Sequence, residues 1–210
     1  MTHKRQRQVF SFATRTAAAL LVAATLSGCA ALLVGGAVGT AVVVTDRRTA
    51  GTQLEDQNIE LKALTRIRDT LAERGHVNVT SFNRQVLITG EVASEADRSA
   101  LEQSIARIEG VRTTVNELAV MGSTSLTARS NDTILTSKVK ATYVDAKDVQ
   151  SGAIKVVTER GTVYLLGRVT EREAARAAEL ARSISGVQKV VRVFDILTEA
   201  ELATLGDQKK

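Results

Sequence analysis

The pattern of apolar and polar positions occurs twice along the chain. Residues 77–92 read VNVTSFNRQVLITGEV and residues 154–169 read IKVVTERGTVYLLGRV, so apolar and polar residues alternate in both stretches. Alternation with a period of two is typical of β-strands. Each stretch therefore predicts two strands joined by a tight turn, at 84–85 in the first copy and at 160–161 in the second.

A helix is predicted after each pair of strands. Thr170 with Glu173 three residues later is a capping box, which marks the start of the helix in the second copy. Ser94 with Asp97 gives a weaker form of this signal in the first copy. Apolar residues three and four positions apart then give each helix one buried face, and a Gly-Val pair ends it before a last strand. These faces consist of Leu101, Ile105 and Ile108 in the first copy and of Ala174, Ala177, Ala178, Ala181 and Ile184 in the second.

Each copy is therefore predicted to be an α-β-β-α-β unit, with its helices on one face of a small mixed sheet, and the fold class is α+β. The first unit is expected at 56–121 and the second at 131–198, with a linker at 122–130 and a polar, loose tail at 199–210. The first helix of the second unit is expected from about residue 132 to 144. Units of this size are close to the lower limit for independent stability, so we expect the two to support each other.

The glycines at the second predicted strand of each unit occupy matching positions. Gly90 and Gly167 correspond at an offset of 77 residues. A glycine inside a strand pattern predicts a positive φ angle or a close approach of another backbone segment.

The first 28 residues are predicted to be a signal peptide. Four basic residues and no acidic one precede an apolar stretch of ten, Ala17 to Leu26. Leu26-Ser27-Gly28-Cys29 then resembles a bacterial lipobox, in which the cysteine is acylated and the chain is cut before it. The basic residues are Lys4, Arg5, Arg7 and Arg15.

The resemblance to a lipobox implies that diacylglycerol and acyl groups on Cys29 are the only attached groups. Ala30 follows the cysteine, which implies release to the inner leaflet of the outer membrane, facing the periplasm. Residues 29–55 would then form a lipidated membrane-proximal segment and a polar linker that begins near Asp46. An uncleaved transmembrane helix over 17–44 is the alternative, although the apolar part after the cleavage site is short of the roughly 20 residues that a span needs.

The charge changes its meaning once the leader is removed. The whole chain has a formal net charge of +5, which alone would favour nucleic acid as a partner. From Cys29 onward, however, 24 basic and 23 acidic residues leave a net charge of +1. Residues 56–121 carry 8 basic and 10 acidic side chains, whereas residues 131–198 carry 11 and 8. We therefore expect no nucleic-acid binding, and a basic second unit.

No catalytic group of residues is recognisable in the sequence. His76 is the one histidine after the leader, and the single cysteine is the predicted acylation site. With no nucleophile motif, no phosphate-binding loop and no metal-ligand spacing, we expect neither an enzyme nor a metal site.

The tandem units resemble two BON domains. The resemblance rests on Gly-x-Val at 90–92 and 167–169 and on Gly-Val at 110–111 and 186–187. Asn131 to Lys140 and Thr158 to Ala174 are similar to the second domain of outer-membrane lipoproteins with two BON domains. This resemblance implies a non-enzymatic, monomeric lipoprotein that supports outer-membrane integrity. It also implies that the second domain binds anionic phospholipid through its first helix, and that the outer-membrane protein assembly machinery is a candidate partner.

The candidate phospholipid-binding residues lie on that first helix. From the residues alone, a helix packed on its own sheet with its lysines in solvent is the favoured interpretation; the resemblance favours lipid contact. Ile134 stands where related proteins carry an aromatic residue, and Tyr143 is expected to compensate. A protein-interaction scaffold is the alternative function, with an enzyme third. The candidate residues are Ile134, Leu135, Lys138, Val139, Lys140, Tyr143 and Val144.

Overall fold

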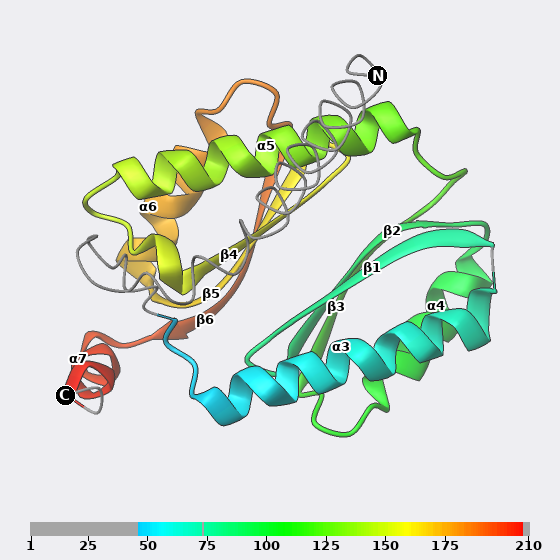
Figure 1. Ribbon diagram of the computed structural model, residues 1–210, viewed down its shortest axis with the longest axis horizontal. Helices are drawn as coiled ribbons and strands as arrows, with labels where there is room; N and C mark the ends of the chain where they lie inside the picture. The colour runs from blue at the N-terminus through cyan, green and yellow to red at the C-terminus, as the bar shows by residue number, and fades with distance from the viewer. Residues whose placement is uncertain (1–45, 73, 208–210) are drawn as a thin grey trace, which may run out of the picture. The chain divides into compact units, whose positions relative to one another are not determined.

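The computed structural model describes residues 46–72 and 74–207, which belong to one compact unit (Figure 1). The predictions on residues 1–45, including the acylation of Cys29, lie outside these residues. Each copy has the predicted order of helix, two strands, helix and strand. The first copy consists of α3 (Ala50–Leu71), β1 (Gly75–Phe82), β2 (Gln85–Val92), α4 (Glu95–Ala106) and β3 (Thr113–Val120). The second consists of α5 (Leu126–Asp145), the 3-10 turn η2 (Ser151–Ala153), β4 (Ile154–Glu159), β5 (Thr162–Thr170), α6 (Glu171–Arg182) and β6 (Lys189–Leu197), and α7 (Glu199–Asp207) follows it.

Both sheets are mixed, as predicted. The strand orders are β1-β2-β3 and β4-β5-β6, and each central strand is antiparallel to the first strand and parallel to the third. The hairpin turns are Asn83-Arg84 and Arg160-Gly161, and all four residues have φ between 50° and 71°. Two successive positive φ angles define the type I′ turn that suits the twist of a hairpin. The first turn thus lies one residue before its predicted position.

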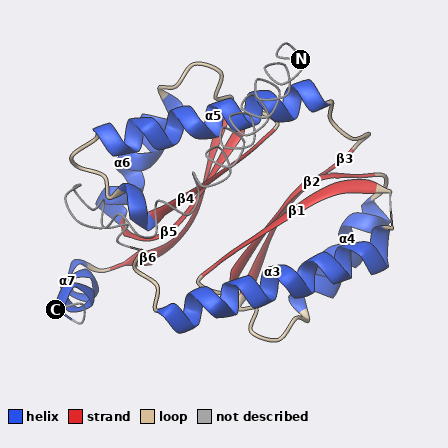
Figure 2. Ribbon diagram, in the orientation of Figure 1, coloured by secondary structure: helices blue, strands red, loops and turns tan. Residues whose placement is uncertain are grey.

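The helices of each copy cover one face of its sheet (Figure 2). In the first copy, Ile59 on α3 and Leu101 on α4 share a core with Ile88 on β2. In the second copy, Val139 on α5 shares a core with Val163 on β5 and with the alanines of α6. These alanines are at most 1% exposed, so small side chains allow α6 to lie close to the sheet. They are Ala174, Ala177, Ala178 and Ala181.

Two glycines make room for the neighbouring strand. Gly90 has a φ of 115°, and a Cβ atom there would collide with the backbone carbonyl of His76 on β1. A Cβ atom on Gly167 would collide with the carbonyl of Ala153, just before β4. The predicted close approach is therefore confirmed in both copies, and the positive φ in the first.

The sheet faces that carry no helices contact each other. Polar bonds flank this contact: Asn78 Nδ2 donates to Glu159 Oε2 over 3.0 Å, and Asn83 Nδ2 donates to Asp195 Oδ2 over 2.7 Å. Within the described residues, three hydrophobic clusters give residues 46–207 a core of their own. The cluster between the sheets consists of Phe82, Leu87, Tyr164, Leu166 and Val193.

The segment before α3 is bound to the second copy. Arg47 makes a bidentate ion pair with Glu173 on α6, both bonds being 2.7 Å long. Arg47 also donates to the carbonyl of Arg168 on β5, and the Arg168 guanidinium donates back to the Arg47 carbonyl. The polar linker predicted to begin near Asp46 is therefore not free at Arg47, because this side chain is bonded to residues 121 and 126 positions further along the chain.

Arg48 binds the first copy. Its guanidinium pairs with Asp46 at 2.6 Å and with Asp56 at 2.8 Å, and it stacks over the Phe82 ring at 4.1 Å. The two charged partners raise the pKa of Arg48 against the opposing effect of burial. Successive arginines therefore connect this short segment to both copies.

Three boundaries differ from the sequence prediction because of polar caps. The Thr49 hydroxyl accepts from Thr52, so α3 begins at Ala50 inside the predicted linker. The Ser125 hydroxyl accepts from Ala128, so α5 begins at Leu126 rather than near residue 132. In the tail, the Thr198 hydroxyl and the Glu201 carboxylate cap each other's backbone N–H, so the predicted loose segment contains a helix.

Candidate functional site

Helix α5 exposes part of the predicted lipid-binding set and buries the rest. Leu135, Val139 and Tyr143 face the sheet and are at most 8% exposed, so they cannot reach a lipid while the domain is folded. The prediction of lipid contact is wrong for these three residues. The exposed set is Ile134, Lys138, Lys140 and Val144. The buried set is Leu135, Val139 and Tyr143.

Tyr143 has a structural role in this helix. Its ring is 1% exposed, and its hydroxyl donates to the carbonyl of Ala177 on α6 over 2.8 Å. Burial raises the pKa of this hydroxyl well above its usual value. Tyr143 therefore joins α5 to α6 and does not compensate for an aromatic residue at Ile134.

The outer side of α5 is less polar than its sequence suggests. Ser130, Thr133, Ser137 and Thr142 each donate their hydroxyl hydrogen to the carbonyl four residues earlier, over 3.0 to 3.1 Å. These bonds satisfy the hydroxyl donors within the helix. Ile134 and Val144 are 53% and 66% exposed. The hydroxyl groups of these serines and threonines already donate their hydrogens within the helix, so they do not need water as an acceptor.

An open cleft of about 580 Å³ lies beside α5. Its walls are α5, the turn between β4 and β5, and the loop between α6 and β6. Asp132 lines it, but the Asp132 carboxylate accepts the N–H groups of Arg160 and Gly161 in the turn, each over 2.8 Å. Lys138 projects a cation at the cleft, and Ile134 adds an apolar edge. The cleft can thus offer an anion one free positive charge beside apolar surface.

Comparison with known proteins assigns the family. The BON domain profile matches residues 55–122 and 131–198. The chain belongs to the BON family. It is 39% identical over 184 residues to the outer membrane lipoprotein DolP of Haemophilus influenzae, which covers 85% of this chain and 95% of that protein. It is also 31% identical over 152 residues to a 21 kDa hemolysin of Actinobacillus pleuropneumoniae, covering 71% of this chain and 78% of the relative.

A more distant relative is the osmotically inducible protein Y of Escherichia coli. It is 29% identical over 117 residues, which cover 54% of this chain and 58% of that protein. In the present chain, the match to the first BON domain begins within α3 and the match to the second begins within α5.

Within residues 46–72 and 74–207, no helix is long and apolar enough to cross a membrane. In the same residues, no three His, Cys, Asp or Glu side chains lie close enough to hold a metal ion. His76, the histidine of the first BON domain, has its Nε2 atom 3.2 Å from Asn78 Nδ2 at the contact between the two sheets.

Sequence reasoning missed the cleft and the Arg47–Glu173 pair. The pair joins residues 126 positions apart, so no local pattern could indicate it. At the cleft, Gly161 in the second turn takes the position of Arg84 in the first, and the effect of this replacement depends on residues of other elements.

Proposed function

We propose that this protein is an outer membrane lipoprotein that binds anionic phospholipid through its second BON domain. Acyl groups on Cys29 would hold it in the inner leaflet, facing the periplasm. The observation that supports this most directly is the outer side of α5, where two large aliphatic side chains and two lysines are exposed together. The net charge of +3 over residues 131–198 points the same way.

The expected affinity is modest. A lysine near an anionic leaflet contributes about 1 kcal/mol. Full burial of an aliphatic side chain contributes about 1.5 to 3 kcal/mol, and Ile134 and Val144 are already partly covered by the protein. Lys138, Lys140 and the two aliphatic side chains are therefore all needed, and the covalent anchor would keep the helix close to its lipid.

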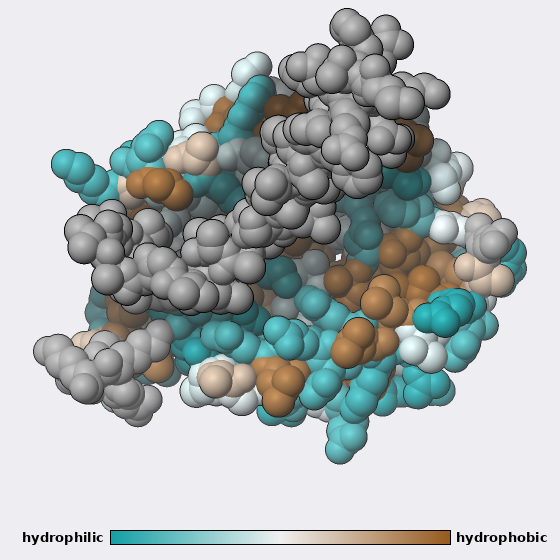
Figure 3. Space-filling view, viewed as in Figure 1, coloured by the Kyte–Doolittle hydropathy of each residue, from teal (hydrophilic) through white to brown (hydrophobic). Residues whose placement is uncertain are grey.

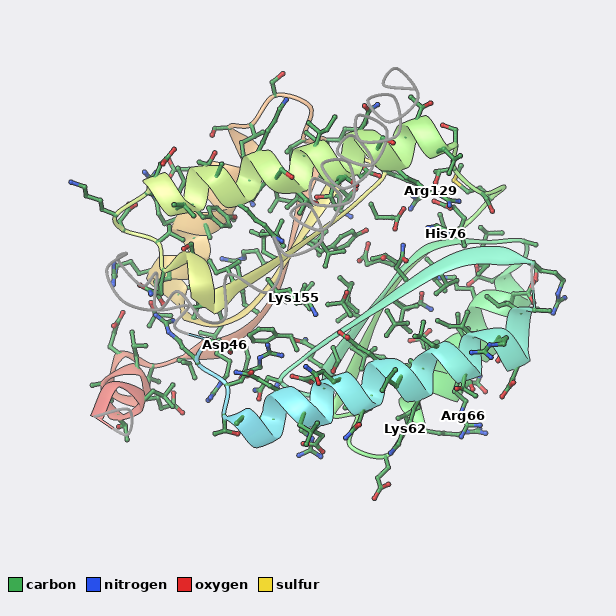
Figure 4. The ribbon with its side chains drawn as sticks, viewed as in Figure 1. Asp46, Lys62, Arg66, His76, Arg129 and Lys155 are labelled. Atoms are coloured by element: carbon green, nitrogen blue, oxygen red, sulfur yellow. The ribbon has the colours of Figure 1, made fainter. Side chains whose placement is uncertain are left out.

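The test is flotation of residues 46–210 with vesicles of phosphatidylglycerol and phosphatidylcholine, compared with pure phosphatidylcholine. We expect binding to the anionic vesicles only, and loss of that binding in the Lys138→Glu, Lys140→Glu variant. The matched control is Lys62→Glu, Arg66→Glu on α3, whose cations are exposed and change the net charge equally (Figure 4). Equal binding to both vesicles, or equal loss in both double variants, would overturn the proposal.

One observation favours a second candidate function, a scaffold for envelope or outer-membrane protein assembly partners. Apolar side chains gather over α3 (Figure 3), where Leu54, Leu61 and Leu64 are 59%, 63% and 51% exposed. Because each BON domain packs its helices on the sheet face away from the other domain, α3 and α5 belong to opposite layers. In intact envelopes, a crosslinker on Leu61 should trap a stoichiometric protein partner, even in the Lys138→Glu, Lys140→Glu variant. Absence of a protein adduct would argue against the scaffold.

A further inference from the structure

The two BON domains share one hydrogen-bonded frame where the first helix meets the first turn. In the first domain, the Asp56 carboxylate accepts the backbone N–H of Arg84 over 2.8 Å. In the second domain, the Asp132 carboxylate accepts the backbone N–H of Gly161, also over 2.8 Å. Arg84 and Gly161 therefore occupy the same position, and the residues around them can be compared one by one.

The first domain fills the space beside this frame with its own charged side chains. Arg84 Nε donates to the carbonyl of Gly110 over 2.7 Å and lies 3.4 Å from Glu55 Oε1. Lys62 Nζ lies 3.6 Å from Glu109 Oε2. Each of these two cations thus has a carboxylate partner, so neither is free to bind an anion at this place.

The second domain has small neutral residues at the equivalent positions. Gly161 takes the place of the arginine, Asn131 that of the helix glutamate, and Ser185 that of the loop glutamate. Lys138 matches Lys62, each lying six residues after the frame aspartate, but Lys138 has no ion-pair partner among the residues that the structure describes. These replacements leave the cleft of about 580 Å³ open.

Lys138 is the cation in this cleft that is free to bind. Arg160 also lines the cleft, but its guanidinium contacts the first domain: Nη1 lies 3.2 Å from Met121 Sδ, and Nε lies 3.6 Å from Glu91 Oε1. Gln188, on the opposite wall, is held by its backbone N–H, which donates to the Gly161 carbonyl over 2.9 Å.

We propose that this cleft binds the phosphodiester of a single anionic glycerophospholipid, an inference that rests on the proposed function. The Lys138 ammonium supplies the charge, and Asn131, Ser185 and Gln188 supply neutral donors for the phosphate oxygens. Ile134 lies at the edge of the cleft, where the glycerol and the start of the acyl chains would follow. The second domain would then recognise a headgroup within a cleft, in addition to the attraction between its basic surface and the bilayer.

The test introduces into the second domain the carboxylate that pairs with the equivalent lysine in the first domain. Ser185→Glu places a carboxylate where Glu109 pairs with Lys62, and so should neutralise Lys138. Ser137→Glu, on the outer side of α5, adds the same charge outside the cleft and serves as the matched control. Residues 46–210 are titrated by NMR with dihexanoyl phosphatidylglycerol below its micelle concentration, and separately with glycerol phosphate.

We expect saturable shifts at the amides of Gly161, Ser185 and Gly186 with the lipid. Ser185→Glu should weaken this binding at least tenfold, whereas Ser137→Glu should weaken it less than threefold, because a hydrogen bond to a charged group is lost only in the first variant. Equal effects of the two variants, or shifts confined to Lys140 and Val144, would overturn the cleft and leave the proposed function standing. Saturable binding of glycerol phosphate without flotation on anionic vesicles would overturn the lipid as the source of the phosphate. An unchanged wild-type spectrum with both ligands, together with flotation on anionic vesicles, would refute the cleft alone.

Discussion

Replacing Arg47 with alanine should destabilise the folded protein although the residue lies outside every helix and strand. Its guanidinium makes two bonds of 2.7 Å to the Glu173 carboxylate, and the two side chains are only 11% and 9% exposed. The hydrogen bonds from Arg47 are the main cause that lowers the pKa of Glu173, against the effect of burial. The alanine variant would leave this carboxylate largely buried without its cation.

The magnitude follows from where this pair lies between two limits. Breaking a fully buried ion pair costs about 3 to 5 kcal/mol, and an exposed pair contributes about 0 to 1 kcal/mol. Glu173 would keep its backbone bond from Thr170 (3.0 Å), so we place the loss for Arg47→Ala at about 2 kcal/mol at pH 7. For a protein of this size, that loss lowers the melting temperature by about 4 to 8 °C.

The pH dependence supplies a second readout with a defined sign. A carboxylate whose folded pKa is lowered stabilises the fold above its unfolded pKa, here about 4.5, and this contribution disappears as the pH falls through the folded value. The difference between wild type and Arg47→Ala should therefore be complete at pH 7 and shrink as the pH falls below about 4.5.

Urea unfolding of residues 46–210, followed by far-ultraviolet circular dichroism at several pH values, measures both quantities. Arg98→Ala is the matched control, because Arg98 pairs with Glu95 on an exposed helix surface at 36% and 67% exposure; it should cost less than about 0.5 kcal/mol. Equal losses for the two variants, or a difference that is constant between pH 7 and pH 4, would refute the reasoning.

Three further predictions concern the cores. Gly90→Ala should lower the free energy of unfolding by about 3 kcal/mol in urea titrations, because φ is 115° and the Cβ atom meets a carbonyl, whereas Gly122→Ala, with open space around it, should change it by less than about 0.5 kcal/mol. Burial raises the pKa of both tyrosines, so the ultraviolet absorbance of Tyr143 and Tyr164 should show no ionisation at pH 10.5 in the folded protein; a half-ionised signal there would contradict their environments. Leu166→Ala, in the cluster between the sheets, should cost about 3 kcal/mol and lower the unfolding midpoints of both BON domains; a loss confined to the second domain would show that the cluster does not couple them.

Features with local causes could be predicted from the sequence. The capping box at Thr170 and Glu173 needs only four residues, and the structure contains both of its bonds. The alanine face of α6 follows from helical spacing alone, and all four alanines are buried. The same spacing places Leu135, Val139 and Tyr143 on one side of α5. Their shared burial could therefore be predicted from the period of the helix. The resemblance implied lipid contact along the whole helix, whereas packing buries one side of it and exposes the other.

Features that depend on distant partners could not be predicted in this way. The segment 46–48 looks like a linker because its charges show no period, and its order depends on carboxylates of both domains. The cleft beside α5 depends on three residues of different elements, each unremarkable in the sequence. Only the alignment of the two frames at Asp56 and Asp132 shows that neutral residues in one domain replace a closed set of charges in the other.

The segment 46–48, which contacts both BON domains, also bears on how tightly the cleft needs to bind its phospholipid. Arg47 is bonded to β5 and α6 of the second BON domain, so the chain that leads back to Cys29 leaves the described part at that domain. Cys29 and Arg47 are 18 positions apart, a stretch that spans at most about 65 Å when fully extended. With Cys29 acylated as proposed, a lipid within such a radius would be present at a local concentration of about 1 mM or more. With the chain held in this way, a cleft with a millimolar dissociation constant for one phospholipid would be half occupied on the membrane, so its selectivity for a headgroup would matter more than its strength.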